Sequence, residues 1–235
     1  MDIFLIRHAQ ARNRISDHRG LKYDHPDPEL SEEGVLQAGS VGERLRSAGV
    51  SVIYTSDLRR TRQTAEIINE SLKAKVEIRE ELREINMGKY EKKSWAEIER
   101  EDPDYYREWL KHLNDLPYPD GESGADVARR CEGVISEIIN GGRQNAVVVT
   151  HGGTLRILLC YFLGIGYEKR FFLGEPIENC SISQVKYDEV KGAFCVHSVN
   201  DTGHLRENER RFIETPKQNP SGQKRSWRRE DLYER

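Results

Sequence analysis

Three short apolar runs spaced along the chain constrain the fold most strongly. They are Ile3–Ile6, Val52–Tyr54 and Ala146–Val149, and each has the length and character of a buried strand. A segment with helical periodicity follows each run at some distance, which is the order of elements in a parallel sheet with helices on its faces. A weaker strand is expected near Val76–Ile78. We therefore predict an α/β fold, a three-layer α/β/α sandwich with a mostly parallel central sheet.

The expected helices are placed by their caps and apolar stripes. Ser31 can cap a helix whose first turn carries acidic residues that suit the helix dipole, and Val35 lies on the expected buried face. Asp57 can cap the next helix. Further helices are expected over Val127–Ile138 and over Gly153–Leu163. The second of these is apolar nearly all round, which indicates a core helix.

The second half of the chain contains two less regular features. A charged and aromatic segment punctuated by prolines predicts a small helical lid, inserted at about residues 94–120. Residues Ser181–Tyr187 and Phe194–Val199 alternate like a hairpin or two edge strands. An exposed edge near Ser181–Tyr187 would be one surface through which a homodimer could form.

Composition changes after about residue 206. Residues 207–235 are rich in Lys and Arg and have few apolar anchors, so they are interpreted as a basic C-terminal extension. Two interpretations stay open for it. It is either a solvated segment or an arm that docks on a partner.

Charge and hydropathy exclude several classes of function. The chain has 235 residues, enough for one α/β domain with its own core. A formal net charge of -3 gives no indication of a nucleic-acid or membrane-surface partner. The longest apolar stretch, Ile157–Leu163, is far shorter than the roughly 18 residues that span a bilayer. With no signal-peptide core at the amino terminus, we expect a cytoplasmic protein.

The four cysteines show no spacing typical of a zinc site, so no metal is expected.

Histidines follow two of the expected strands. The motif Arg-His-Ala-Gln at residues 7–10 leaves the first strand, and Thr-His-Gly-Gly at residues 150–153 leaves another. Ligands of open α/β sheets bind at the carboxyl ends of the strands, so His8 and His151 are expected at one edge. The glycines let the backbone approach a ligand, and the following helix presents free N–H groups. This arrangement favours an anionic ligand.

Two further segments reach the same rim of the sheet. Residues 56–65 begin a helix just after the second strand, and they carry Arg60. The positive charge of an arginine at a helix start is repelled by the positive end of the helix dipole, and a bound anion would offset this repulsion. Glu84 lies in a loop after the weak strand, where it is uninformative by itself.

Taken in this order, the four segments resemble the motifs of the histidine phosphatase superfamily, also called phosphoglycerate mutase-like. Its R-H-G-E/Q motif is matched at residues 7–10, and its S-x-L-x-R-A-x-Q-T-A motif at residues 56–65. Its L-x-E-x-x-x-G element is matched at residues 82–88, and V-x-H-G-G-x-x-R at residues 149–156. Each motif is weak alone, but four in order are specific. The resemblance implies one histidine phosphatase domain over residues 1–206.

The resemblance also implies roles for individual residues. His8 would attack phosphorus and carry the phosphoryl group, because a neutral imidazole is available near neutral pH. Arg7, Arg60 and His151 would bind the phosphate oxygens, and Glu84 would protonate the leaving oxygen. The implied substrate-binding positions are Gln10, Asn13 and Gly152. Phosphoryl transfer needs mostly positioning and electrostatics, so no metal or other cofactor is implied.

Two positions depart from the family pattern. Ala9 stands where the family usually has glycine. The family often has asparagine at the position of Arg14, whereas Asn13 lies one place earlier here. These departures motivate one alternative function, a weakly catalytic module that binds a phosphorylated partner and docks through its basic extension.

The leading hypothesis is a metal-independent phosphomonoester hydrolase that acts on a small phosphorylated metabolite. A 2,3-bisphosphoglycerate-dependent phosphoglycerate mutase is the alternative within the family. That branch shields its site from water with a longer insertion between the acidic motif and the second histidine. The corresponding segment here, Met87–Ser123, is short, which favours water as the acceptor.

Overall fold

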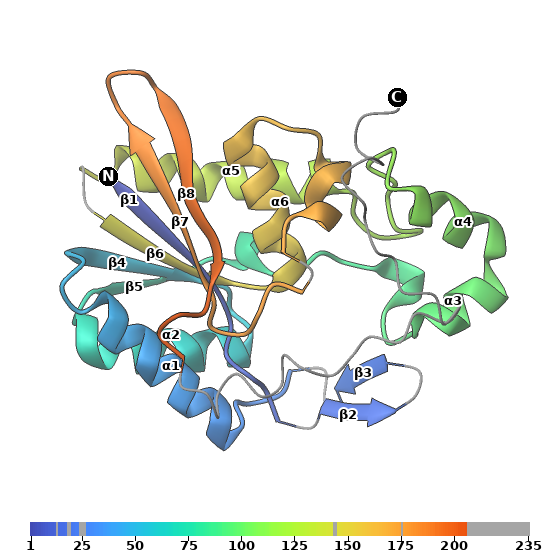
Figure 1. The fold of residues 1–235 in the computed structure, drawn as a ribbon, viewed down its shortest axis with the longest axis horizontal. Helices are drawn as coiled ribbons and strands as arrows, with labels where there is room; N and C mark the ends of the chain where they lie inside the picture. The colour runs from blue at the N-terminus through green and yellow to red at the C-terminus, as the bar shows by residue number, and fades with distance from the viewer. Residues whose placement is uncertain (13, 18–19, 24–26, 143–144, 175, 206–235) are drawn as a thin grey trace, which may run out of the picture.

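A six-stranded sheet forms the centre of the molecule (Figure 1). The computed structural model describes residues 1–12, 14–17, 20–23, 27–142, 145–174 and 176–205. The strands are β1 (Asp2–Arg7), β4 (Val50–Thr55), β5 (Lys75–Ile78), β6 (Asn145–Thr150), β7 (Ile182–Asp188) and β8 (Ala193–Asp201). Their order is β5-β4-β6-β1-β7-β8; the first four are parallel, and β7 and β8 join antiparallel. The three predicted buried strands fall on β1, β4 and β6, and the weaker predicted strand falls on β5, whose side chains are mostly exposed.

Helices cover both faces of this sheet. They are α1 (Glu32–Leu45) and α2 (Arg59–Leu72) on one face, and α5 (Gly124–Asn140) and α6 (Gly152–Leu163) on the other. Because side chains alternate along β1, Phe4 and Ile6 pack toward α1 and α2, whereas Ile3 and Leu5 pack toward α5 and α6. The predicted three-layer α/β/α architecture is therefore confirmed.

The helix starts agree with the sequence prediction only in part. Ser31 caps α1, since its hydroxyl accepts a hydrogen bond of 3.0 Å from the Gly34 N–H. Val35 is 46% exposed, so its predicted burial is wrong; the buried stripe is centred on Val41, and Val35 falls on its solvent edge. The predicted Asp57 cap is also wrong. The Asp57 carboxylate instead accepts hydrogen bonds from a guanidinium group, which competes with the backbone amides of α2.

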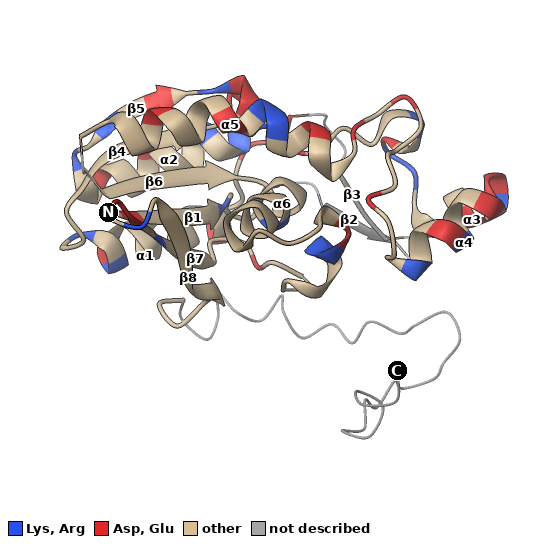
Figure 2. Ribbon diagram, turned by 90° about the horizontal axis from the view of Figure 1, so that it is seen from above, with Lys and Arg blue, Asp and Glu red and all other residues tan. Residues whose placement is uncertain are grey.

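The segment predicted to form a helical lid contains α3 (Trp95–Glu101) and α4 (Pro103–Lys111). Both helices project from the carboxyl edge of the sheet, and charged residues line their outer sides (Figure 2). Aromatic packing joins them: the rings of Trp95 and Trp109 stack with centroids 3.9 Å apart. The aromatic side chains of this segment therefore pack on one another.

Three shorter helical turns and one hairpin complete the described elements. They are η1 (Glu80–Leu82), η2 (Gly88–Tyr90), η3 (Tyr167–Phe172), and the paired strands β2 (Arg14–Asp17) and β3 (Gly20–Tyr23). The β2–β3 hairpin was not predicted. It lies on the same side of the sheet edge as α3 and α4 (Figure 1).

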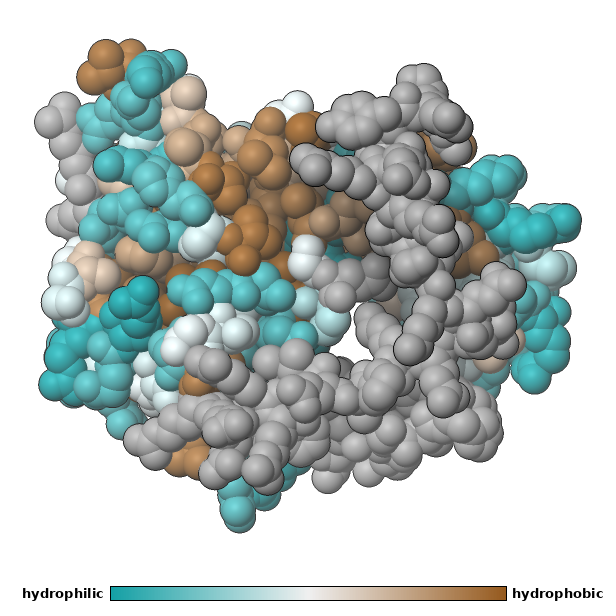
Figure 3. Space-filling model, in the orientation of Figure 1, coloured by the Kyte–Doolittle hydropathy of each residue, from teal (hydrophilic) through white to brown (hydrophobic). Residues whose placement is uncertain are grey.

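The predicted hairpin in the last third of the domain is present as β7 and β8. Strand β7 lies between β1 and β8, so Ser181–Tyr187 is not an edge of the sheet, and the surface suggested for a homodimer is wrong in that respect. Exposed apolar side chains gather over α6 and the residues after it, including Leu163, Ile165 and Phe172 (Figure 3). In the described part of the chain, no helix is both long and apolar enough to cross a bilayer.

Candidate active site

Three neighbouring parallel strands end at one place on the sheet edge. His8 directly follows β1, Ser56 directly follows β4, and His151 directly follows β6. These strands are hydrogen-bonded side by side, with β6 in the middle. Their carboxyl ends therefore bring side chains from distant parts of the sequence into contact, as open α/β sheets do at their ligand sites.

The His8 ring is held in a single orientation. Its Nδ1 lies 2.8 Å from the Ala9 carbonyl oxygen, and a carbonyl oxygen can only accept, so Nδ1 carries the proton. Nε2 is then unprotonated, and it accepts a hydrogen bond of 3.3 Å from the Arg60 Nε–H. The side chain of Asn179 donates to the His8 carbonyl at 2.6 Å. The buried imidazole thus presents an unprotonated Nε2 beside the Arg60 guanidinium.

His151 is fully buried and uses both ring nitrogens. Its Nδ1 lies 3.1 Å from Arg60 Nη2, and its Nε2 lies 2.9 Å from the Ser56 hydroxyl. A guanidinium can only donate, so Nδ1 accepts, and Nε2 donates to Ser56. Burial, followed by the charges of His8 and Arg60, holds the pKa of His151 well below its ordinary value. The ring is therefore neutral near neutral pH and orients Arg60.

Arg60 connects the two histidines. It is the second residue of α2, and its side chain is only 8% exposed. The rings of His8 and His151 lie edge to face, with centroids 5.2 Å apart. Asp27 approaches the same guanidinium, with its carboxylate oxygen 3.8 Å from Arg60 Nη1. One buried cationic group therefore lies within reach of both imidazoles.

Arg7 points a second guanidinium toward this edge. One of its terminal nitrogens donates to the Ile177 carbonyl, whereas its buried Nε has no hydrogen-bond partner among the described residues. A Cβ atom added to Gly152 would lie 3.5 Å from that Nε, an ordinary contact. An unsatisfied buried N–H is costly, so an anion that accepted from it would be stabilised.

The loop after His8 is held by side chains of the neighbouring helices. The Ala9 N–H donates to Thr64 Oγ1 at 3.0 Å, and the Gln10 N–H donates to Gln37 at 3.1 Å. The Gln10 side-chain oxygen accepts from the Ser31 hydroxyl at 2.7 Å. A Cβ atom on Gly34 would lie 2.1 Å from the Gln10 carbonyl oxygen, so only glycine allows α1 to approach this loop.

Glu84 lies at the amino terminus of α6, next to His151. Its carboxylate accepts hydrogen bonds from the N–H groups of Gly153 at 3.1 Å and of Thr154 at 2.9 Å. The positive end of the α6 dipole favours a carboxylate at this point. A Cβ atom on Gly153 would lie 2.7 Å from Glu84 Oε1, so glycine is needed for this close approach.

The predicted site residues are thus found in three different situations. Direct contacts join His8, Arg60 and His151. At the same edge, Arg7 ends β1, and Glu84, in the loop after η1, contacts the start of α6. Gln10 is packed against α1, and Gly152 begins α6. The last predicted residue, Asn13, lies outside the described residues.

Three residues that orient these groups were not predicted from the sequence. They are Ser56, Thr64 and Asn179, which bind His151, the Ala9 amide and the His8 carbonyl. Ser56 and Thr64 stand inside the second motif, so the motif itself carried that signal. Asn179 has no signal in its surroundings. In the part of the chain that the structure describes, no group of three His, Cys, Asp or Glu side chains is arranged to hold a metal ion.

Known proteins match this chain over most of its length. The family model described as the histidine phosphatase superfamily (branch 1) matches residues 3–202. The probable phosphoglycerate mutase GpmB of Salmonella arizonae is 32% identical over 213 residues, which cover 87% of this chain and 95% of the relative.

Solved structures give the same fold. The mycobacterial glucosyl-3-phosphoglycerate phosphatase in complex with inorganic phosphate is 25% identical, with a TM-score of 0.72, and the match covers 87% of this chain and 99% of that one. The alpha-ribazole phosphatase of Shigella flexneri matches with a TM-score of 0.70 over 86% of this chain and 96% of that one. At 22% identity, the second of these likenesses concerns the fold alone.

Proposed function

Because the chain belongs to the histidine phosphatase superfamily, we propose that it hydrolyses phosphomonoesters through a phosphohistidine on His8, without a metal ion. One observation carries the proposal. His8 donates from Nδ1 to a carbonyl and presents Nε2, unprotonated, beside the guanidinium of Arg60. An attacking nitrogen is thereby already placed next to a cation that can hold the phosphate it attacks.

The first half-reaction forms the covalent intermediate. The lone pair of His8 Nε2 attacks phosphorus, a P–N bond forms, and the P–O bond to the leaving group breaks. The guanidinium groups of Arg60 and Arg7 offset the charge on the phosphoryl oxygens. The Arg7 Nε–H, which has no hydrogen-bond partner among the described residues, can donate to one of these oxygens. Glu84, in its protonated form, gives its proton to the leaving oxygen.

The second half-reaction returns the enzyme to its starting state. Water attacks the phosphohistidine, the P–N bond breaks, and Glu84 takes the proton of that water. His151 assists in both halves by orienting Arg60 through Nδ1. A phosphate oxygen near that nitrogen would favour proton uptake by His151, which then becomes a further donor.

The substrate that we propose is a small phosphorylated metabolite. The solved relative bound to inorganic phosphate is a phosphatase of such a compound, a glucosylated phosphoglycerate. The α3–α4 segment lies beside the site edge and carries stacked aromatic rings, so it is the part of the fold best placed to select among leaving groups.

A mutase is the second candidate, because the relative from Salmonella arizonae bears that name. It would use the same attack by His8 and would transfer the phosphoryl group to a second hydroxyl in place of water. The only difference required of this chain is that the site excludes water while the phosphohistidine lasts.

One assay separates these candidates. With EDTA present, we expect release of p-nitrophenol and phosphate from p-nitrophenyl phosphate, and loss of that release in His8→Ala. Interconversion of 3- and 2-phosphoglycerate that requires 2,3-bisphosphoglycerate and yields little free phosphate would establish the mutase. Turnover by His8→Ala equal to that of the wild type would refute the mechanism altogether.

The weakly catalytic interaction module makes a different prediction. Its motivation lies in Ala9, in the shifted position of Asn13 and in the basic extension; Asn13 and residues 207–235 lie outside the described residues. Hydrolysis of the aryl phosphate at enzymatic rates by a chain that ends at residue 206 would remove that motivation. Phosphate binding without turnover would favour it.

A further inference from the structure

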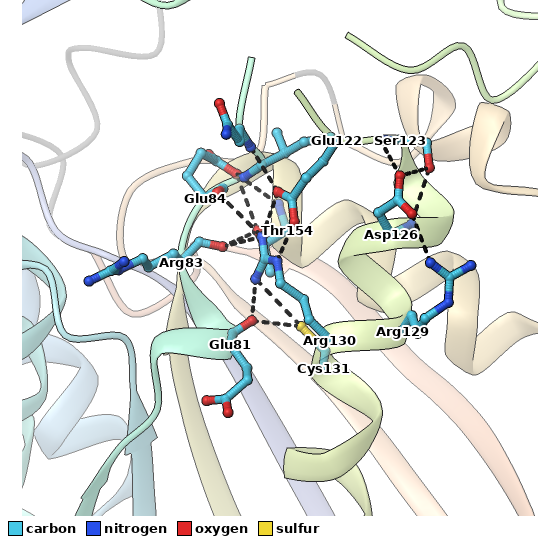
Figure 4. A network of polar contacts seen from close by, with 12 residues as sticks. Glu81, Arg83, Glu84, Glu122, Ser123, Asp126, Arg129, Arg130, Cys131 and Thr154 are labelled. Carbon is cyan, nitrogen blue, oxygen red and sulfur yellow. Dashed lines mark hydrogen bonds and ion pairs between the residues drawn. The ribbon is translucent and has the colours of Figure 1, made fainter. Parts of the chain in front are cut away.

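A single arginine on α5 holds the loop that carries Glu84. The Arg130 guanidinium donates to three carbonyl oxygens of that loop: those of Glu81, of Arg83 at 2.9 Å and of Glu84 at 3.3 Å (Figure 4). Residues 81–84 include the end of η1 and no regular strand. Their carbonyls consequently need partners from outside the segment.

Arg130 is itself fixed by a carboxylate. Its Nε lies 2.8 Å from Glu122 Oε1, and its Nη2 lies 3.2 Å from Glu122 Oε2, a two-pronged ion pair with both side chains about four-fifths buried (21% and 22% exposed). Glu122 also accepts from the Asn86 N–H at 2.9 Å. The Arg130–Glu122 pair is therefore hydrogen-bonded to the loop backbone both before and after Glu84.

Threonine side chains at the end of β6 and the start of α6 also donate to carbonyls of this loop. Thr150 donates to the Leu82 carbonyl at 2.7 Å, and Thr154 donates to the Arg83 carbonyl at 2.7 Å. Thr154 also offers its N–H to the Glu84 carboxylate. Every carbonyl from residue 81 to residue 84 thus has a side-chain donor, and both the backbone and the carboxylate of Glu84 are fixed.

We propose that Arg130, locked by Glu122, is a positioning residue for proton transfer by Glu84. This inference rests on the proposed function, since it needs Glu84 to be the acid. Arg130 contacts the loop backbone and leaves the Glu84 carboxylate to α6. It acts by keeping that carboxylate at the distance from the leaving oxygen at which a proton can be passed.

The test compares two aryl phosphates of similar size, p-nitrophenyl phosphate and phenyl phosphate. p-Nitrophenolate leaves readily without a proton, whereas phenolate needs one, so a misplaced acid slows only the second substrate strongly. In Arg130→Met we expect kcat/KM for phenyl phosphate to fall by about 100-fold, and that for p-nitrophenyl phosphate to fall far less. The parameter kcat/KM is used because it reports the step that forms the phosphohistidine.

Arg129→Met is the matched control. Arg129 precedes Arg130 on α5 and pairs with Asp126 at 2.8 Å, but its side chain is 72% exposed and touches no carbonyl of the Glu84 loop in the described structure. We expect this variant to keep wild-type kcat/KM for both substrates. If Arg130→Met fails to fold, as judged by its melting temperature, Glu122→Gln replaces it, because that variant keeps the shape and weakens the lock on Arg130.

Glu84→Gln, measured in parallel, separates the two levels of the proposal. If Glu84→Gln distinguishes the substrates and the Arg130 variant slows both equally, or neither, the positioning role is overturned and the mechanism stands. If Glu84→Gln itself does not distinguish them, the acid role in the proposed function fails, and the positioning inference fails with it.

Discussion

Replacement of Gly153 by alanine is expected to separate activity from stability. The added Cβ would lie 2.7 Å from Glu84 Oε1 and 2.9 Å from Ile85 Cγ2. An ordinary separation is about 3.5 Å, so the carboxylate must move by somewhat less than about 1 Å. Displacement of a reacting group by that amount costs about 100-fold in rate, and we expect a loss of that order in kcat/KM for phenyl phosphate.

The cost in folding free energy is expected to be small by comparison. Overpacking costs about 1–3 kcal/mol, but alanine is favoured over glycine in a helix by about 1 kcal/mol. Since Gly153 lies in the first turn of α6, the free energy of unfolding should fall by only about 0–2 kcal/mol. Urea unfolding and steady-state kinetics on the same preparation measure both quantities.

Gly133→Ala supplies the control for this experiment. Gly133 lies within α5, and a Cβ atom there would meet nothing within 4 Å. That variant should gain about 0.5–1 kcal/mol of stability and keep full activity. A Gly153→Ala enzyme with unchanged kcat/KM for phenyl phosphate would refute the view that the position of Glu84 limits the reaction.

Three other perturbations test the site. Because the pKa of buried His151 is low, the unfolded chain takes up a proton near pH 6.5 and the folded chain does not. The free energy of unfolding should therefore fall by up to about 1.4 kcal/mol per pH unit below pH 6.5. Urea unfolding should show a smaller dependence on pH in His151→Gln. Ser56→Ala leaves the His151 Nε2–H without its acceptor and should cost about 1–3 kcal/mol in the same assay; an unchanged midpoint would count against the assigned tautomer. Inorganic phosphate at about 100 times its Kd should stabilise the protein by about 2.7 kcal/mol, and thermal unfolding of Arg60→Met should show no such effect; equal protection of both would place phosphate elsewhere.

The strands and the core helix were predictable because their signals are local. The apolar runs that became β1, β4 and β6 are short and bounded, and α6 is apolar nearly all round, so the burial of most of these residues followed from composition. The parallel order then placed His8 and His151 at one edge. This much of the site follows from the general behaviour of α/β sheets.

The features that the sequence did not predict depend on tertiary contacts. Asp57 was expected to cap α2, but Arg83, 26 positions later, binds its carboxylate. Asn179 reaches the His8 carbonyl from 171 positions away, with no pattern around it to indicate so. The hydrogen bonds from Arg130 to the Glu84 loop were likewise not predicted, because Arg130 and its partner Glu122 look like ordinary surface charges in the sequence.

Direct detection of the phosphoenzyme tests the central claim. The wild-type chain would be mixed with p-nitrophenyl phosphate, quenched within the first turnover in alkali, in which a phosphohistidine survives, and mapped by mass spectrometry. The account predicts one added phosphoryl group on the peptide that contains His8, with no such group in His8→Ala. Steady turnover without any phosphohistidine, or a phosphoryl group carried by a residue other than His8, would contradict it.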